Sequence, residues 1–158
     1  MKKIIFAMMA AGVFTLSSCS GDDLSGPGAQ DGNVIITARI PGVMHGRYGE
    51  GEVAKTLHYA VYEGNDVVFA SDKPGSPAPQ TVDAKNFRLA LNLVKGKTYD
   101  FVFWADASEG SPYEFSSSSK SVTVNYDNVG NNENRDAFFQ AVKDLTVDGA
   151  LTKAVELR

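Results

Sequence analysis

The stretch of residues 96–107, GKTYDFVFWADA, constrains the fold more than any other part of this sequence. It follows a turn-like Lys-Gly pair and is made mostly of aromatic and β-branched residues. Tyr99, Phe101 and Phe103 recur at a period of two, which is the period of side chains along a β-strand. Because Val102 and Trp104 make the other face largely apolar as well, the pattern predicts a central strand that is covered on both faces.

The N-terminus has the pattern of an export signal. Two lysines precede an apolar run over residues 4–16, and small residues lead to Cys19. The run is shorter than the ~20 residues that a membrane-spanning helix needs, so residues 1–18 are predicted to be a signal peptide. The ending LSSC resembles the lipobox of bacterial lipoproteins, which predicts cleavage between Ser18 and Cys19 and acylation of the Cys19 thiol. The alternative is an ordinary secretion signal followed by a chance cysteine.

Composition excludes several classes of protein. Cys19 is the only cysteine, so neither a disulfide framework nor a cysteine-based metal site is available. The formal net charge is −4 and becomes more negative once the two lysines of the signal are removed. An acidic chain of this kind argues against nucleic acid as a partner, and the predicted membrane attachment is through lipid at Cys19.

The chain after the signal divides into a tether and one domain. Residues 19–32 are rich in Gly, Ser and Asp and predict a flexible tether. Asp22 and Asp23 in it resemble an acidic surface-export signal, although a merely soluble linker has the same composition. We expect residues 33–158 to form a domain that continues beyond the last residue, because strand-like sequence runs to the end.

Short alternating segments separated by polar turns predict an all-β domain, an antiparallel β-sandwich. We expect residues 87–93 to pair with the central strand as its antiparallel neighbour. One short helix is predicted over residues 135–142, where Phe138, Phe139 and Val142 would form an apolar face. Tyr113 and Phe115, in a Ser-rich segment, are expected to be lids over the core. The remaining expected strands span residues 33–40, 56–63, 66–70, 121–126 and 151–158.

Several segments, taken together and in this order, resemble the fimbrillin-like lipoproteins of Bacteroides-type bacteria, in particular their amino-terminal domain. The resemblance rests on LSSC at 16–19, ARIPG at 38–42, LHYAVY at 57–62, LVKGKTYDFVFWA at 93–105 and RDAFF at 135–139. It implies a transthyretin-like β-sandwich on the cell surface or in the outer membrane, acting as a subunit or anchor of fimbriae. Family members usually continue into a second domain that ends in a donor strand, and neither is present in this sequence.

The resemblance also implies maturation by a trypsin-like protease that cuts after an arginine, followed by donor-strand exchange between subunits. Two arginines precede the second expected strand. Arg39 lies inside the first expected strand, whereas Arg47 lies in a glycine-rich loop. A protease needs accessible, mobile backbone, so Arg47 is the better candidate.

Catalytic and metal-binding patterns find little support, and we expect no enzyme activity, no cofactor and no metal. His45 and His58 are the only histidines, and without a cysteine ligand beyond the predicted lipid anchor a zinc site has too few soft ligands. Residues 125–133 slightly resemble a calcium loop, but with the wrong spacing. Trp104 could serve as a platform for a sugar ring, although its place in the strand favours the core. The alternative function is therefore a surface glycan-binding lipoprotein module, which exposed coplanar aromatic side chains would favour.

Overall fold

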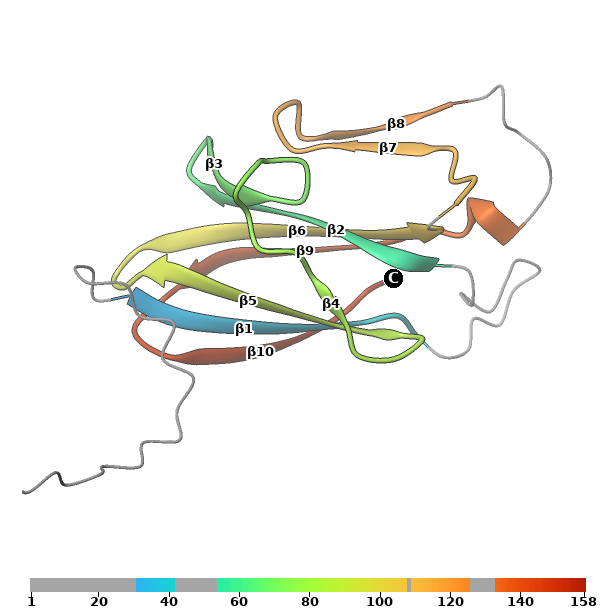
Figure 1. The fold of residues 1–158 in the computed structure, drawn as a ribbon. Helices are drawn as coiled ribbons and strands as arrows, with labels where there is room; N and C mark the ends of the chain where they lie inside the picture. The colour runs from blue at the N-terminus through green and yellow to red at the C-terminus, as the bar shows by residue number, and fades with distance from the viewer. Residues whose placement is uncertain (1–30, 42–53, 108, 126–132) are drawn as a thin grey trace, which may run out of the picture.

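A computed structural model describes residues 31–41, 54–107, 109–125 and 133–158. Two four-stranded sheets face each other, and a separate hairpin lies outside one of them (Figure 1). The first sheet has the order β10 (Leu151–Glu156), β1 (Asp31–Arg39), β5 (Asn86–Val94), β4 (Gln80–Thr81). The second has the order β3 (Asp66–Ala70), β2 (Ala54–Glu63), β6 (Thr98–Ala107), β9 (Phe138–Thr146). The hairpin consists of β7 (Tyr113–Ser116) and β8 (Ser121–Val124). These elements confirm the predicted all-β, sandwich-like fold.

The strand β6 is central, as the sequence predicts. It pairs antiparallel with β2 on one side and with β9 on the other. Tyr99, Phe101 and Phe103 point into the sandwich and are at most 1% exposed. They pack against the inward residues of β5 in one apolar core, and a buried aromatic ring of this size contributes much of the energy of such a core.

The strand β1 lies in the interior of the first sheet. It pairs antiparallel with β5 and parallel with β10, which adds one parallel pair to an otherwise antiparallel fold. Val34, Ile36 and Ala38 on its inner face are at most 1% exposed. Because β1 begins at Asp31, the last two residues of the predicted tether belong to the sheet. The rest of the tether, and the predicted signal peptide, lie outside the described residues.

The expected pairing of β5 with the central strand is wrong. The two strands lie in different sheets, so the turn between them crosses from one layer to the other. Gly96 stands in this turn at φ +82°, a left-handed conformation that glycine adopts without steric cost. Its backbone N–H donates to Val147 O at 2.7 Å, and Val147 N–H donates to Lys97 O at 2.9 Å. These bonds hold the crossing turn against the equivalent crossing between β9 and β10.

The helix predicted over residues 135–142 is also wrong. A single turn of 3₁₀ helix, η2 (Glu133–Arg135), is followed by the strand β9. In a strand, Phe138 and Phe139 point to opposite faces, and indeed Phe138 is 3% exposed whereas Phe139 is 46% exposed. Pairing with β6 over its length supplies the backbone hydrogen bonds that the helix would otherwise have made internally.

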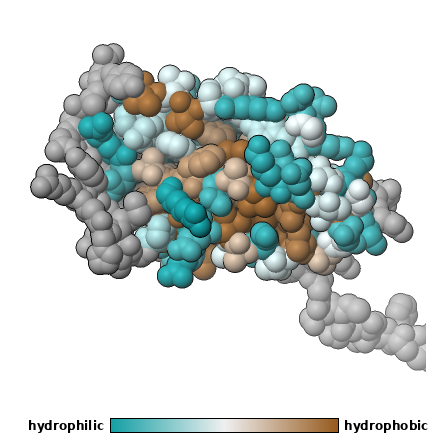
Figure 2. All heavy atoms as spheres, turned by 180° about the vertical axis from the view of Figure 1, so that it is seen from behind, coloured by the Kyte–Doolittle hydropathy of each residue, from teal (hydrophilic) through white to brown (hydrophobic). Residues whose placement is uncertain are grey.

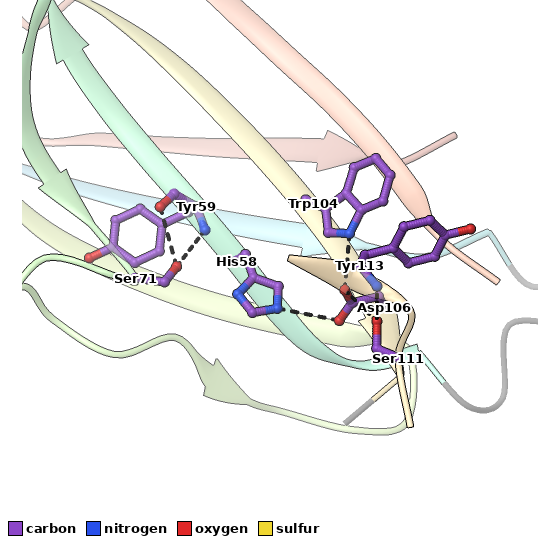
Figure 3. Close-up of polar contacts among 7 residues, drawn as sticks. All are labelled: His58, Tyr59, Ser71, Trp104, Asp106, Ser111 and Tyr113. Carbon is purple, nitrogen blue, oxygen red and sulfur yellow. Dashed lines mark hydrogen bonds and ion pairs between the residues drawn. The ribbon is translucent and has the colours of Figure 1, made fainter. Parts of the chain in front are cut away.

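The predicted hairpin of β2 and β3 is confirmed, with Gly64 at φ +61° in its turn. The segment after β3 returns across β2, where Tyr59 N–H donates to Ser71 Oγ at 2.6 Å (Figure 3).

No helix in the described part of the chain is long and apolar enough to cross a membrane. On the face seen in Figure 2, hydrophobic residues gather in a band bordered by hydrophilic ones.

Candidate functional site: a groove beneath the β7–β8 hairpin

The β7–β8 hairpin lies over the outer face of the second sheet (Figure 1). A small apolar cluster outside the main core joins it to that sheet. Buried residues of β2 and β3 form the cluster, and Phe115 of β7 and Val102 of β6 pack against them. The strand β6 therefore contributes to two apolar clusters. Its odd-numbered residues lie in the core of the sandwich, and Val102 lies in the cluster beneath the hairpin.

The base of the hairpin is fixed by Asp106, which is 1% exposed (Figure 3). Its Oδ2 accepts hydrogen bonds from Trp104 Nε1 at 3.1 Å and from Ser111 Oγ at 3.0 Å. The Ser111 hydroxyl in turn accepts a bond from the backbone N–H of Tyr113 at 3.2 Å. The Tyr113 ring then packs edge-on against the Trp104 ring, with centroids 5.2 Å apart. One buried carboxylate thus links β6 to the start of β7.

The second oxygen of Asp106 faces His58 on β2. Asp106 Oδ1 lies 3.3 Å from His58 Nε2 and accepts no hydrogen bond of good geometry, so the imidazole is its polar neighbour. The His58 ring also stacks on Phe115, with centroids 5.6 Å apart. The three side chains His58, Asp106 and Ser111 are not arranged as a hydrolase triad, because the serine hydroxyl bonds to the carboxylate and not to the imidazole.

The tip of the hairpin is fixed separately. The Tyr62 hydroxyl donates to Ser117 O at 2.9 Å in a buried bond, and Ser117 N–H donates to Asp72 Oδ2 at 2.8 Å. Burial acts to raise the pKa of Asp72, but hydrogen bonds from the Ser117 side chain and backbone outweigh it and the pKa is lowered. Burial, and then the charge of Asp72, raise the pKa of Tyr62. Lys120 also lies at the tip, with its Nζ 4.7 Å from the centroid of the Tyr62 ring.

Between these two anchor points the hairpin and the sheet border a groove of about 330 Å³. We call this the hairpin groove. Its apolar walls come from five strands, β2, β6, β7, β8 and β9, and its polar rim carries three charged side chains. The aromatic residues are Tyr62, Trp104, Phe115 and Phe139, and the charged residues are Asp100, Lys120 and Lys143. Trp104 and Phe139 are register partners on β6 and β9, so together they form part of the floor.

The structure places the residues singled out in the sequence as follows. Ser18, Cys19, His45 and Arg47 lie outside the described residues. Arg39 is at the end of β1, where its carbonyl accepts a hydrogen bond from Leu157 N–H at 2.8 Å. Trp104, expected in the core, is only half-buried and lies on the outer face of the sheet. Residues 125–133, which slightly resemble a calcium loop with the wrong spacing, lie largely outside the described residues, and no cluster of three potential metal-binding side chains occurs within the described part of the chain.

Sequence reasoning missed most of the groove. The predicted helix over residues 135–142 contains Phe139 and ends beside Lys143, and no sequence pattern indicates a role in binding for Tyr62 or Lys120. A strand interpretation of residues 138–143 would have placed Phe139, Ala141 and Lys143 on one face, and all three line the groove. On the opposite face, Phe138, Gln140 and Val142 recur at a period of two, and this period is the sequence signal that indicates a strand.

The fold and the groove define the class: a β-sandwich domain with a hairpin held over the outer face of one sheet. Residues 51–158 match a family described as "Family of unknown function (DUF6562)", and the chain belongs to that family. The match covers every strand from β2 onward, and β1 precedes it. No curated protein matches this sequence.

Proposed function

We propose that this protein is a cell-surface lipoprotein of the outer membrane that acts as a subunit or anchor of fimbriae and assembles by donor-strand exchange. The observation that carries the proposal is the position of β1. It is the first described strand of the chain, yet it lies in the interior of its sheet between β5 and β10. Removing it would leave a gap one strand wide.

The energetics of β1 support exchange after cleavage but not before it. Val34, Ile36 and Ile40 are at most 1% exposed, and burial of each such side chain stabilises by about 1.5–3 kcal/mol. While β1 is covalently continuous with β2, this energy keeps it in place. Once the connection is cut, β1 is held by non-covalent contacts alone. A strand from another subunit with the same alternation could then replace it and pair with both exposed edges.

The connection between β1 and β2 contains Arg47, whereas Arg39 is paired within the sheet. We therefore expect an arginine-specific protease to cut the folded protein at Arg47 and to leave a new amino terminus at Tyr48. Mass spectrometry of the digest would identify that terminus. An Arg47→Lys variant is the control, and it should resist the protease.

The cut protein should then take up a labelled peptide of the β1 sequence, residues 31–40. A peptide with Ile36→Asp is the matched control and should not bind, because Ile36 faces the core. Concentration-dependent oligomers would also support the proposal. Resistance at Arg47, or a cut protein that stays monomeric and ignores both peptides, would contradict it.

The proposed anchor is tested separately at Cys19. Metabolic labelling with a palmitate analogue should mark the wild-type protein and leave Cys19→Ser unlabelled. Equal labelling of the two proteins would contradict acylation at this residue while leaving donor-strand exchange open.

The burial of Tyr99 and Phe101 favours the fimbrial role over the alternative of a glycan-binding module, whereas Trp104, which is half-buried on the outer face, does not. Tyr99 and Phe101 are 1% exposed and cannot contact a sugar. The rings of Trp104 and Tyr113 meet at 73°, so they do not form a coplanar platform. A glycan-binding role predicts a flat aromatic surface, and these pairs do not provide one.

A further inference from the structure

We propose that the hairpin groove is a binding site for a small amphipathic monocarboxylate, with its apolar body against Trp104 and Phe139 and its carboxylate at Lys143. This inference goes beyond the proposed fimbrial role and does not depend on it. It rests on three features of the groove: its fixed shape, its apolar floor and the balance of charge at its rim.

The groove is preformed. Asp106 fixes one end of the hairpin through Ser111 and Trp104, and Tyr62 and Asp72 fix the other end through Ser117. A loop held at only one end would collapse onto the sheet and bury its apolar side chains. Held at both ends, the hairpin keeps a space of about 330 Å³, at the small end of the ~300–1,000 Å³ range of small-molecule sites.

The floor of the groove leaves apolar surface uncovered. Phe139 is 46% exposed and is one of three large hydrophobic residues in the described chain that are exposed. Its register partner Trp104 is half-buried, and Ala141 two residues further along β9 adds no bulk. An apolar chain or ring lying along β9 would cover this surface, which is the main source of affinity in such sites.

The rim provides one cation without a partner. Among the described residues the ion pairs are Lys97 with Glu63 and His58 with Asp106, so Lys143 has no carboxylate within ion-pair distance there. Lys120, the other lysine of the rim, already donates to Asn65 Oδ1 at 3.2 Å and lies over Tyr62. Lys143 is thus the positive charge available to a ligand, in a protein whose net charge is negative.

The same rim argues against other ligand classes. The Asp100 carboxylate also lines the groove, and its repulsion grows with each further negative charge on a ligand, which disfavours a polyanion more than a monoanion. Two lysines disfavour a cationic ligand despite the aromatic walls. A neutral sugar would need several directional hydrogen bonds, whereas Asp100 Oδ1 already accepts one from Asp144 N–H at 2.9 Å. A single carboxylate on an apolar body fits these conditions.

Binding in the groove can be followed by intrinsic tryptophan fluorescence, because Trp104 is the only tryptophan and lines the groove. Purified protein would be titrated with decanoate below its micelle concentration while the tryptophan emission is followed. Decanol, decyltrimethylammonium and maltose are the comparison probes. We expect a saturable change with decanoate, binding of decanol about tenfold weaker, and no saturable change with the other two.

Two pairs of variants locate the site. Lys143→Met should weaken decanoate about tenfold and leave decanol unchanged, whereas Lys153→Met, at an exposed position of β10, should change neither. Ala141→Phe should fill the floor and abolish binding of both probes, and Ala154→Phe, also exposed on β10, should not. Thermal melts would establish that each variant is folded.

The proposal is overturned if decanoate gives no saturable response, or if maltose or the cationic probe binds more tightly than decanoate. It is equally overturned if Lys143→Met behaves like Lys153→Met. Because none of these measurements involves Arg47 or β1, their failure would leave the fimbrial proposal standing, and failure of strand exchange would leave the groove unaffected.

Discussion

The buried carboxylate of Asp106 lies 3.3 Å from the imidazole of His58 on the neighbouring strand. Its other oxygen accepts two hydrogen bonds, from the Trp104 indole and the Ser111 hydroxyl. A single side chain on β6 therefore joins the outer face of the sheet to the hairpin that covers it. The shape of the groove depends on this joint, because the hairpin has no backbone pairing with either four-stranded sheet.

Replacing Asp106 should release the base of the hairpin. Asp106→Ala leaves the Trp104 N–H and the Ser111 hydroxyl without their acceptor, and we expect a loss of about 2–4 kcal/mol of unfolding free energy. Urea denaturation would measure it, and the Trp104 emission should shift to longer wavelength as the ring becomes exposed. Glu114→Ala, at an exposed position of β7, is the control and should cost less than about 0.5 kcal/mol. Equal costs would contradict the anchoring role.

The aromatic residues of β6 should be the most costly to shorten. Phe101 and Phe103 are at most 1% exposed, and their rings lie 6.3 Å apart within the core. Phe101→Ala and Phe103→Ala are each expected to cost about 3–5 kcal/mol. Phe115→Ala should cost clearly less, because Phe115 belongs to the hairpin and is only half-buried. Thermal melts that ranked Phe115 above both strand residues would contradict β6 as the centre of the fold.

The sequence was sufficient for local structure wherever one periodicity dominated. The alternation in β5 and β6 predicted both strands and their inward faces. A shift of one residue along either strand would exchange its two faces and bury polar side chains. In β9 the apolar residues at 138, 139 and 142 fit a helical stripe as well as a strand. Pairing with β6, which is distant in the sequence, decided between them.

Long-range pairing could not be predicted in the same way. The parallel contact of β1 with β10 joins the first and last of the described strands, and nothing in either segment specifies it. The groove likewise depends on long-range contacts, because its aromatic residues come from four different strands: Tyr62, Trp104, Phe115 and Phe139. Each residue alone has an ordinary pattern, and only the tertiary fold brings them together.

Gly32 at the start of β1 should not tolerate a side chain. A Cβ at this position would lie 2.1 Å from Val147 Cγ1 and 3.3 Å from the carbonyl oxygen of Gly149. Val147 cannot easily move, because its backbone is bonded in both directions to the crossing turn at residues 96–97. We expect Gly32→Ala to cost about 1–3 kcal/mol in urea denaturation.

Two further variants test the origin of that cost. Adding Val147→Ala should recover part of the loss from Gly32→Ala, because it removes the colliding methyl group. Gly149→Ala is the control, since a Cβ there meets nothing within 4 Å. A double variant that is merely additive would show that the contact with Val147 is not the cause.

The stability of the protein should depend on Tyr59 at alkaline pH. Burial raises the pKa of the Tyr59 hydroxyl from 10.0 to about 12, although a hydrogen bond with the Ser76 side chain lowers it in part. The side chain is 0% exposed, and its hydroxyl donates to Pro77 O at 2.6 Å. In the unfolded chain the same hydroxyl ionises near pH 10. Between pH 10 and 12 the folded state therefore holds a proton that the unfolded state has lost, and stability decreases as pH rises.

A shift of this size corresponds to about 2–3 kcal/mol over that interval. Tyr59→Phe cannot ionise, so it should lack this part of the pH dependence. At pH 7 we expect the variant to be less stable than the wild type by about 1 kcal/mol, because Pro77 O loses its donor. The difference should narrow and then reverse as pH approaches 12, when measured by urea denaturation at a series of pH values. Parallel curves for the two proteins from pH 9 to 12 would contradict a raised pKa at Tyr59.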